Sequence, residues 1–315
     1  MSAAPVGKSW RAHRYEVGLE KIREYAHAVG EEAPIFHHRD VASAAGFSSV
    51  PAPPVFAAVF CAPAVGAAIF DPEVGIFDPE VGIASYRFVH KAQHFDFHRP
   101  VLAGEAVTTT VRLSVAEDLD DGRALRVFES VSVDDSGAPL VSARYEGVVP
   151  PPMAAGGSRR SEPRAPLQAG PPAADPGRPG EGEGLADLRF TPDRYAPIRY
   201  AGASGDFTPF HLDGDLARAM ALEGVILHGL YTFAQVARAH TAPFGSDPRT
   251  LRALSGRFRR PAYPERELLV RTVISHSDGG GRLRTIGEAL QGDSSVVGDV
   301  GGLLELGAAA GFPSP

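Results

Sequence analysis

The pattern of hydrophobic and polar positions along this chain predicts the same series of elements twice. In the first copy, residues 19–29 have the spacing of a short helix, and residues 40–45 predict a second helical piece. Residues 54–70 are apolar on all sides, which is typical of a buried helix, although Pro63 lies inside them. From His90 onward the pattern is strand-like. β-Branched alternation predicts strands at residues 107–115, 124–133 and 140–149.

The second copy repeats this order. Residues 200–205 lead into a loop, residues 212–222 predict a short helix, and residues 225–240 predict a long, mostly apolar helix. Strand patterns follow at residues 268–276, 282–290 and 295–306. A long buried helix followed by antiparallel strands, made twice, predicts an α+β protein built from two similar units.

A segment rich in proline and glycine separates the two copies. Residues 150–184 contain 9 Pro and 7 Gly and almost no large apolar side chain. Such a segment cannot bury enough apolar surface to offset the entropy lost on ordering. We therefore expect a first domain at residues 1–149, a linker at residues 150–184 and a second domain at residues 185–315. A total of 315 residues agrees with two domains.

Composition and charge narrow the class of protein. The net charge of −7 leaves no basic footprint for nucleic acid, and the single Cys61 excludes a disulfide framework and a cysteine-rich metal site. Residues 1–14 lack the apolar core of a signal peptide, and no run reaches the ~18 apolar residues that a membrane span needs. We expect a cytoplasmic protein without nucleic-acid or membrane partners.

One loop of the second copy carries the residues best suited to acid–base chemistry. Asp206 and His211 lie five residues apart in the sequence SGDFTPFH, and together a carboxylate and an imidazole can move a proton and a hydroxyl in one step. Seventeen residues beyond His211, the pair His228-Gly229 precedes the apolar stretch. The amide of Gly229 would then be an unsatisfied donor at a helix N-terminus, where an oxyanion is stabilised.

The run GDFTPFHLD followed by HG resembles the signature of the MaoC-like family of (R)-specific enoyl-CoA hydratases and 3-hydroxyacyl thioester dehydratases. The usual pattern, Gly-Asp-x-Asn-Pro-x-His, is matched at Gly205, Asp206, Pro209 and His211, with Thr208 where Asn is usual. The N-terminal part resembles the degenerate half of two-domain members. The resemblance implies a double hotdog, in which each half is a long helix wrapped by an antiparallel β-sheet and the sheets join as a pseudo-dimer.

The resemblance also implies the function of a hydro-lyase: reversible hydration of trans-2-enoyl thioesters, or dehydration of (R)-3-hydroxyacyl thioesters, in fatty-acid or related acyl metabolism. Asp206 and His211 match the catalytic dyad, and Gly229 matches the residue whose amide holds the thioester carbonyl oxygen. The neighbouring substrate loop comprises Thr208, Pro209 and His228. No cofactor and no metal is expected, because the thioester already acidifies the C2 proton.

The first copy lacks this chemistry at the equivalent positions. Its counterparts are Glu31, a longer acid, Phe36, which carries no proton, and Pro54, which has no N–H to donate. We therefore expect one active site per chain, with the first half serving as scaffold and substrate channel. The sequence FDPEVGI occurs twice in tandem, at residues 70–76 and 77–83, and is expected to be a surface insertion.

Several alternatives stay open at this point. A hotdog acyl thioesterase is disfavoured by the Asp-x4-His loop. A non-catalytic accessory subunit that binds acyl thioesters is favoured by the degenerate first half and by Thr208. The sequence leaves undecided the acyl chain length, coenzyme A against acyl carrier protein as the carrier, the direction and pathway, which member of the dyad is the base, and whether the pseudo-dimer pairs further into a homodimer.

Overall fold

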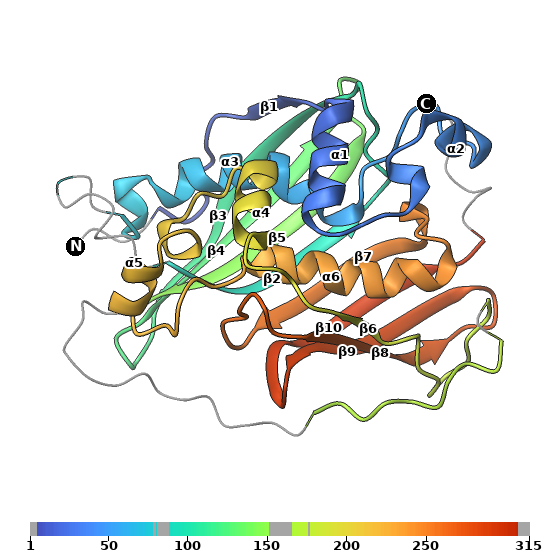
Figure 1. The fold of residues 1–315 in the computed structure, drawn as a ribbon. Coiled ribbons are helices and arrows are strands. Elements are labelled where there is room, and N and C mark those ends of the chain that lie inside the picture. The colour runs from blue at the N-terminus through green and yellow to red at the C-terminus, as the bar shows by residue number, and fades with distance from the viewer. Residues whose placement is uncertain (1–4, 78–79, 81–87, 151–165, 176, 308–315) are drawn as a thin grey trace.

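A single antiparallel sheet forms the framework of the computed structural model, which describes residues 5–77, 80, 88–150, 166–175 and 177–307 (Figure 1). Its strands within these residues run in the order β1-β3-β4-β5-β2-β7-β10-β9-β8-β6. They are β1 His13–Glu16, β2 Val89–Phe97, β3 Ala106–Asp118, β4 Ala124–Val133, β5 Pro139–Val149, β6 Leu188–Phe190, β7 Leu251–Phe258, β8 Leu268–Ser277, β9 Arg282–Gln291 and β10 Ser294–Glu305. The helices are α1 Leu19–Ala28, α2 Arg39–Ala44, α3 Ala57–Ile69, α4 Ala196–Ser204, α5 Gly214–Ala219 and α6 Gly229–Thr241.

The two halves of the sheet meet at the β2–β7 pair. There Phe95 pairs with Leu254 and Gln93 with Gly256. Outward from this joint the strand order is the same on both sides once each strand is replaced by its counterpart, β5 by β10, β4 by β9, β3 by β8 and β1 by β6. The predicted α+β class and the joining of two sheets into one pseudo-dimer are therefore confirmed.

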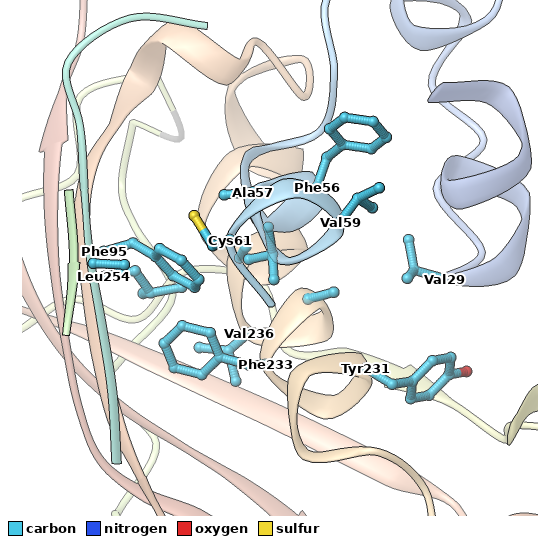
Figure 2. Packing of buried hydrophobic residues seen from close by; sticks show 14 of the residues in the cluster. Val29, Phe56, Ala57, Val59, Cys61, Phe95, Tyr231, Phe233, Val236 and Leu254 are labelled. Carbon is cyan, nitrogen blue, oxygen red and sulfur yellow. The ribbon is translucent and has the colours of Figure 1, made fainter. Parts of the chain in front are cut away.

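The long helices α3 and α6 lie on one face of the sheet and form the core with it (Figure 1). Figure 2 shows side chains of both helices meeting those of the central strands, with Cys61 on α3, Phe233 on α6 and Phe95 on β2. All three are fully buried, and the rings of Phe95 and Phe233 lie 6.1 Å apart. Among the described residues no helix is both long and apolar enough to cross a bilayer.

Two helix predictions were wrong in their details. Residues expected only to lead into a loop form α4, which ends at Gly205 because that residue adopts φ +80° and turns the chain. The predicted helix at residues 225–240 begins only at Gly229. Leu227 instead donates its amide to the Ala262 carbonyl at 2.7 Å, and His228 is extended with φ −62° and ψ 141°.

The first copy of the tandem repeat lies mostly at the surface, as predicted, but two of its side chains are buried. Val74 and Ile76 are 0% and 1% exposed, so their apolar side chains belong to the core. The carbonyl of Val74 accepts a hydrogen bond of 3.0 Å from Nε of Arg126 on β4. Most of the second copy, residues 78–79 and 81–83, lies outside the described residues.

The C-terminal part of the predicted linker follows strand β8. The Gly182 amide donates to the Ile274 carbonyl at 2.9 Å, and Gly184 forms a β-bridge with Val273. Backbone hydrogen bonds thus tie this end of the segment to the sheet despite its composition. Residues 151–165 and 176 of the predicted linker lie outside the described residues.

A close contact between α6 and the sheet makes Gly302 on β10 sensitive to substitution. A methyl group there would lie 2.7 Å from Nε2 of His240 and would also overlap the Thr285 hydroxyl. These two buried groups are hydrogen-bonded to each other at 2.8 Å. We expect Gly302→Ala to lower the free energy of unfolding by about 1–3 kcal/mol, measured by urea denaturation.

Gly66→Ala is the matched control for this substitution. Gly66 lies inside α3, and a methyl group there meets no atom within 4 Å. Because alanine favours a helix interior over glycine by about 1 kcal/mol, this variant should be unchanged or stabilised. An equal loss of stability in both variants would contradict the steric explanation.

Candidate active site

The loop after α4 holds the carboxylate of Asp206 in one orientation. Oδ1 of Asp206 accepts hydrogen bonds from the backbone N–H of Thr208 at 3.1 Å and from its hydroxyl at 2.6 Å. The next residues, Pro209–His211, form one turn of 3-10 helix. Thr208, which stands where the family pattern has Asn, thus donates directly to this carboxylate.

His211 faces the same carboxylate from the end of this turn. Its side chain is buried, and Nδ1 lies 2.9 Å from the carbonyl oxygen of Ile226. Because a carbonyl only accepts hydrogen bonds, Nδ1 must carry the proton and donate it. In the neutral ring Nε2 then keeps its lone pair, as a proton acceptor requires.

His228 links the start of α6 to the Asp206 loop. Nε2 of His228 donates to the backbone carbonyl of Asp206 at 2.9 Å, and its ring stacks on that of His211 with centroids 3.8 Å apart. The residue is 1% exposed, and its Nδ1 is buried without a hydrogen-bond partner among the described residues. The sequence pattern had assigned His228 only to the substrate loop.

The structure therefore brings together the two residues of the predicted dyad and adds a third. One oxygen of Asp206 and one ring nitrogen each of His211 and His228 lie within 4.8 Å of one another. The spacing of the motif does not indicate His228 as a third member, because a hydrogen bond from its ring to the backbone carbonyl of Asp206 brings it to the site.

Burial and neighbouring charges set the protonation of the three groups. Burial alone would raise the pKa of the Asp206 carboxyl, but His228, His211 and the two Thr208 hydrogen bonds outweigh it and lower that pKa. Burial lowers the pKa of His211 to about 4, with His228 adding to the effect and Asp206 opposing it. Burial also lowers the pKa of His228. At neutral pH the site holds one carboxylate and two neutral imidazoles.

Gly229, the predicted oxyanion residue, is the first residue of α6. In the described part of the chain its amide donates to no other group, which is expected at a helix N-terminus. A methyl group on Gly229 would approach the Phe258 ring to 3.1 Å. The amide follows directly after His228, whose ring touches both members of the predicted dyad.

The first half has different side chains at the equivalent positions. Glu31 repeats the turn, since its Oε1 accepts the Ala33 amide at 3.1 Å, but Oε2 faces Nε of Arg238 on α6 at 3.6 Å. Phe36 is fully buried, and Pro54 starts the 3-10 turn before α3. An ion pair and a phenyl ring thus replace the acid–base pair, as the sequence comparison of the two copies predicts.

One residue near the site comes from the first half and was missed. The ring of His90, on β2, lies 4.7 Å from that of Phe258, which covers Gly229, and burial lowers the pKa of His90 to about 4. In the alignment of the two copies that pairs Phe97 with Phe258, His90 pairs with Leu251. The internal repeat therefore does not indicate His90 as a site residue. His90 comes close to Phe258 because its strand, β2, pairs with β7, the strand that carries Phe258.

Comparisons with known proteins match a family model to each half of the chain. A family model described as the FAS1-like dehydratase domain region matches residues 4–154, and the model of the MaoC like domain matches residues 181–291. A UPF0336 protein of Clavibacter michiganensis is 39% identical over 129 residues, which are 41% of this chain and 81% of that protein. A UPF0336 protein of Streptomyces avermitilis is 36% identical over 139 residues, 44% of this chain and 87% of its own.

Solved structures share the fold along nearly the whole chain. A MaoC-like dehydratase superposes with a TM-score of 0.72 at 20% identity, covering 96% of this chain and 99% of its own. A conserved hypothetical protein from Mycobacterium tuberculosis, described as having a double hotdog fold, gives 0.62 at 18% identity, covering 96% of both chains. The peroxisomal multifunctional enzyme type 2 of Drosophila melanogaster gives 0.64 at 20% identity, with 93% of this chain matching 48% of that one.

Fold and site together define a double hotdog protein whose second half carries a carboxylate–imidazole pair at the start of its central helix. The chain carries a region that matches the FAS1-like dehydratase domain followed by a MaoC like domain, and it belongs with the UPF0336 proteins among its relatives.

Proposed function

We propose that this chain catalyses the reversible hydration of trans-2-enoyl thioesters to (R)-3-hydroxyacyl thioesters, carried by coenzyme A or acyl carrier protein. The observation that carries the proposal is the pairing of an ionised Asp206 with a neutral His211, whose Nδ1 donates to the Ile226 carbonyl and whose Nε2 has no hydrogen-bond partner among the described residues. Gly229 begins helix α6 directly after His228 of the same cluster. The match of residues 181–291 to the MaoC like domain supports this reaction class.

In the proposed reaction the pair binds one water molecule. The pair accepts one proton from this water as the oxygen attacks C3 of the enoyl group, and it returns a proton to C2. The site begins and ends with one carboxylate and one neutral imidazole, and the net change is the addition of one water. The reverse sequence eliminates the 3-hydroxyl group.

The amide of Gly229 would bind the carbonyl oxygen of the thioester. Negative charge develops on the thioester carbonyl oxygen during the addition, and an N–H at a helix N-terminus stabilises such charge. The absence of a side chain at Gly229 keeps Phe258 at its present position and leaves the backbone open to the substrate. The Thr208 hydroxyl holds Asp206 for the proton transfer.

The test is an assay of the purified full chain with crotonyl-CoA and with longer enoyl-CoA thioesters, followed by loss of the enoyl absorbance and by release of free thiol. Loss of enoyl absorbance without thiol supports the proposal, and a chain-length series then defines the substrate. Thiol release instead indicates a thioesterase. If enoyl thioesters on coenzyme A and on carrier protein are all inert, a binding subunit without its own catalysis is the remaining interpretation.

A further inference from the structure

A group of cationic side chains lies at the end of the β2–β7 pair, next to the candidate active site. Arg257 and Arg259 flank Phe258 in the chain, and a methyl group on Gly229 would approach the ring of Phe258 to 3.1 Å. The register of the pair ends at Arg257, so Arg259 and Lys91 of β2 lie just beyond the last paired residues. The cationic residues are therefore direct neighbours of a ring that lies against the proposed oxyanion residue.

Lys91 is the cation of this group that has no counter-ion. Within the described residues it forms no ion pair and no hydrogen bond, and its side chain is half-buried. Burial lowers the pKa of Lys91, and the positive charges of Arg123, Arg257 and Arg259 lower it further. We call these four residues the basic cluster. An ammonium group in such surroundings is stabilised when an anion binds beside it.

The arginines of the basic cluster are only partly neutralised. Their carboxylate partners are Asp121 for Arg123, Glu146 for Arg257 and Asp299 for Arg259. Glu146 faces Arg257 at 2.9 Å and also Arg144 at 3.1 Å, so one carboxylate serves two guanidinium groups. An excess of positive charge therefore remains here, although the net charge of the chain is −7.

The equivalent place in the first half lacks this excess. In the alignment of the two copies that pairs Phe97 with Phe258, the counterparts of Lys91, Arg257 and Arg259 are Arg252, Asp96 and His98. Arg252 is paired with Glu305 at 2.7 Å, and Asp96 adds a carboxylate where the second half has a guanidinium group. The unbalanced positive charge thus accompanies the half that keeps the acid–base pair.

We propose that the basic cluster binds a phosphate group of the pantetheine arm that carries the acyl thioester. The proposal rests on the proposed function, because it takes the substrate to be such a thioester. Guanidinium and ammonium groups both bind phosphate strongly. Arg257 lies on the opposite face of the sheet from Phe258, since side chains alternate along a strand. The arm would pass between the two faces where the pairing of β2 and β7 ends.

The test is calorimetric binding of butyryl-CoA, a saturated thioester that cannot be hydrated, to the full chain. We expect Lys91→Gln to raise the Kd of butyryl-CoA by a factor of about ten, because a charge-assisted contact to phosphate is lost. Lys91→Arg should bind close to the parent chain. Butyryl-pantetheine, which has no phosphate, should bind equally to the parent chain and to all variants.

The matched control is Lys8→Gln, which removes the same charge from the first half, where Lys8 is paired with Asp71. Its Kd for butyryl-CoA should be unchanged. Weaker binding of butyryl-phosphopantetheine by Lys91→Gln supports the 4′-phosphate, which coenzyme A and carrier protein share. Weaker binding of butyryl-CoA alone supports the nucleotide phosphates of coenzyme A.

Two results would overturn the phosphate site. One is unchanged binding of butyryl-CoA by Lys91→Gln, and the other is an equal loss of butyryl-pantetheine binding in that variant. The outcome is separable from the proposed reaction, because butyryl thioesters report binding alone. A parent chain that binds butyryl-CoA through Lys91 but turns over no enoyl thioester contradicts the proposed function and leaves the phosphate site standing.

Discussion

Replacing Asp206 with asparagine should lower turnover of an enoyl thioester by a factor of about 10²–10⁴, which is the usual contribution of a positioned acid–base group. The substitution preserves the shape of the side chain and an oxygen that can accept from Thr208, but it removes the negative charge. The measurement is kcat with crotonyl-CoA, together with the melting temperature to show that the fold persists.

The matched control for this substitution is its counterpart in the first half, Glu31→Gln. Glu31 occupies the equivalent turn, but its carboxylate faces Arg238, and the buried Phe36 stands at the position equivalent to His211. We expect the kcat of this variant to stay close to that of the parent chain, with some loss of stability from the weakened ion pair. If both variants lose activity alike, each half contributes to catalysis and the expectation of one active site per chain is wrong.

The second large effect is expected at Gly229. Exchanging it for proline, the residue found at the equivalent position 54, removes the N–H that we assign to the thioester carbonyl oxygen. Loss of one such donor lowers kcat by a factor of about 10²–10³. Proline is tolerated at the first position of a helix, and the extended conformation of His228 suits a residue before proline. The variant should therefore fold.

Gly229→Ala separates the lost hydrogen bond from the added bulk. Alanine keeps the N–H, but its methyl group approaches the Phe258 ring to 3.1 Å, so a smaller loss of kcat is expected. The comparison of kcat in the proline and alanine variants, with melting temperatures alongside, measures the contribution of the amide. Equal losses in both variants would assign the effect to steric crowding and would remove Gly229 from the proposed chemistry.

Much of the fold could be read from the pattern of the chain because each half has strong local periodicity. The strand at residues 124–133 and the two long helices were recognisable from β-branched alternation and from apolar runs. The start of α6 was not, because residues 225–227 are also apolar, and tertiary hydrogen bonds such as that from Leu227 to Ala262 keep them out of the helix. Similarly, nothing in FDPEVGI indicates that Val74 and Ile76 enter the core.

The candidate site was only partly readable from the sequence. Asp206 and His211 share one loop, so their spacing is a local property that a motif can express. His228 reaches the pair through a hydrogen bond to the Asp206 backbone, and His90 approaches it from the other half. Such contacts depend on the path of the backbone between distant segments, which residue spacing does not encode.

The sequence by itself therefore determined that the chain repeats one unit twice and which copy keeps the acid, the imidazole and the free helix amide. These conclusions depend only on residue identity and short spacings. The tertiary structure decided that the two sheets join at β2 and β7, and that the side chains of Asp206, His211 and His228 come together. Strand register and side-chain direction arise from packing across the whole core, and no local pattern carries them.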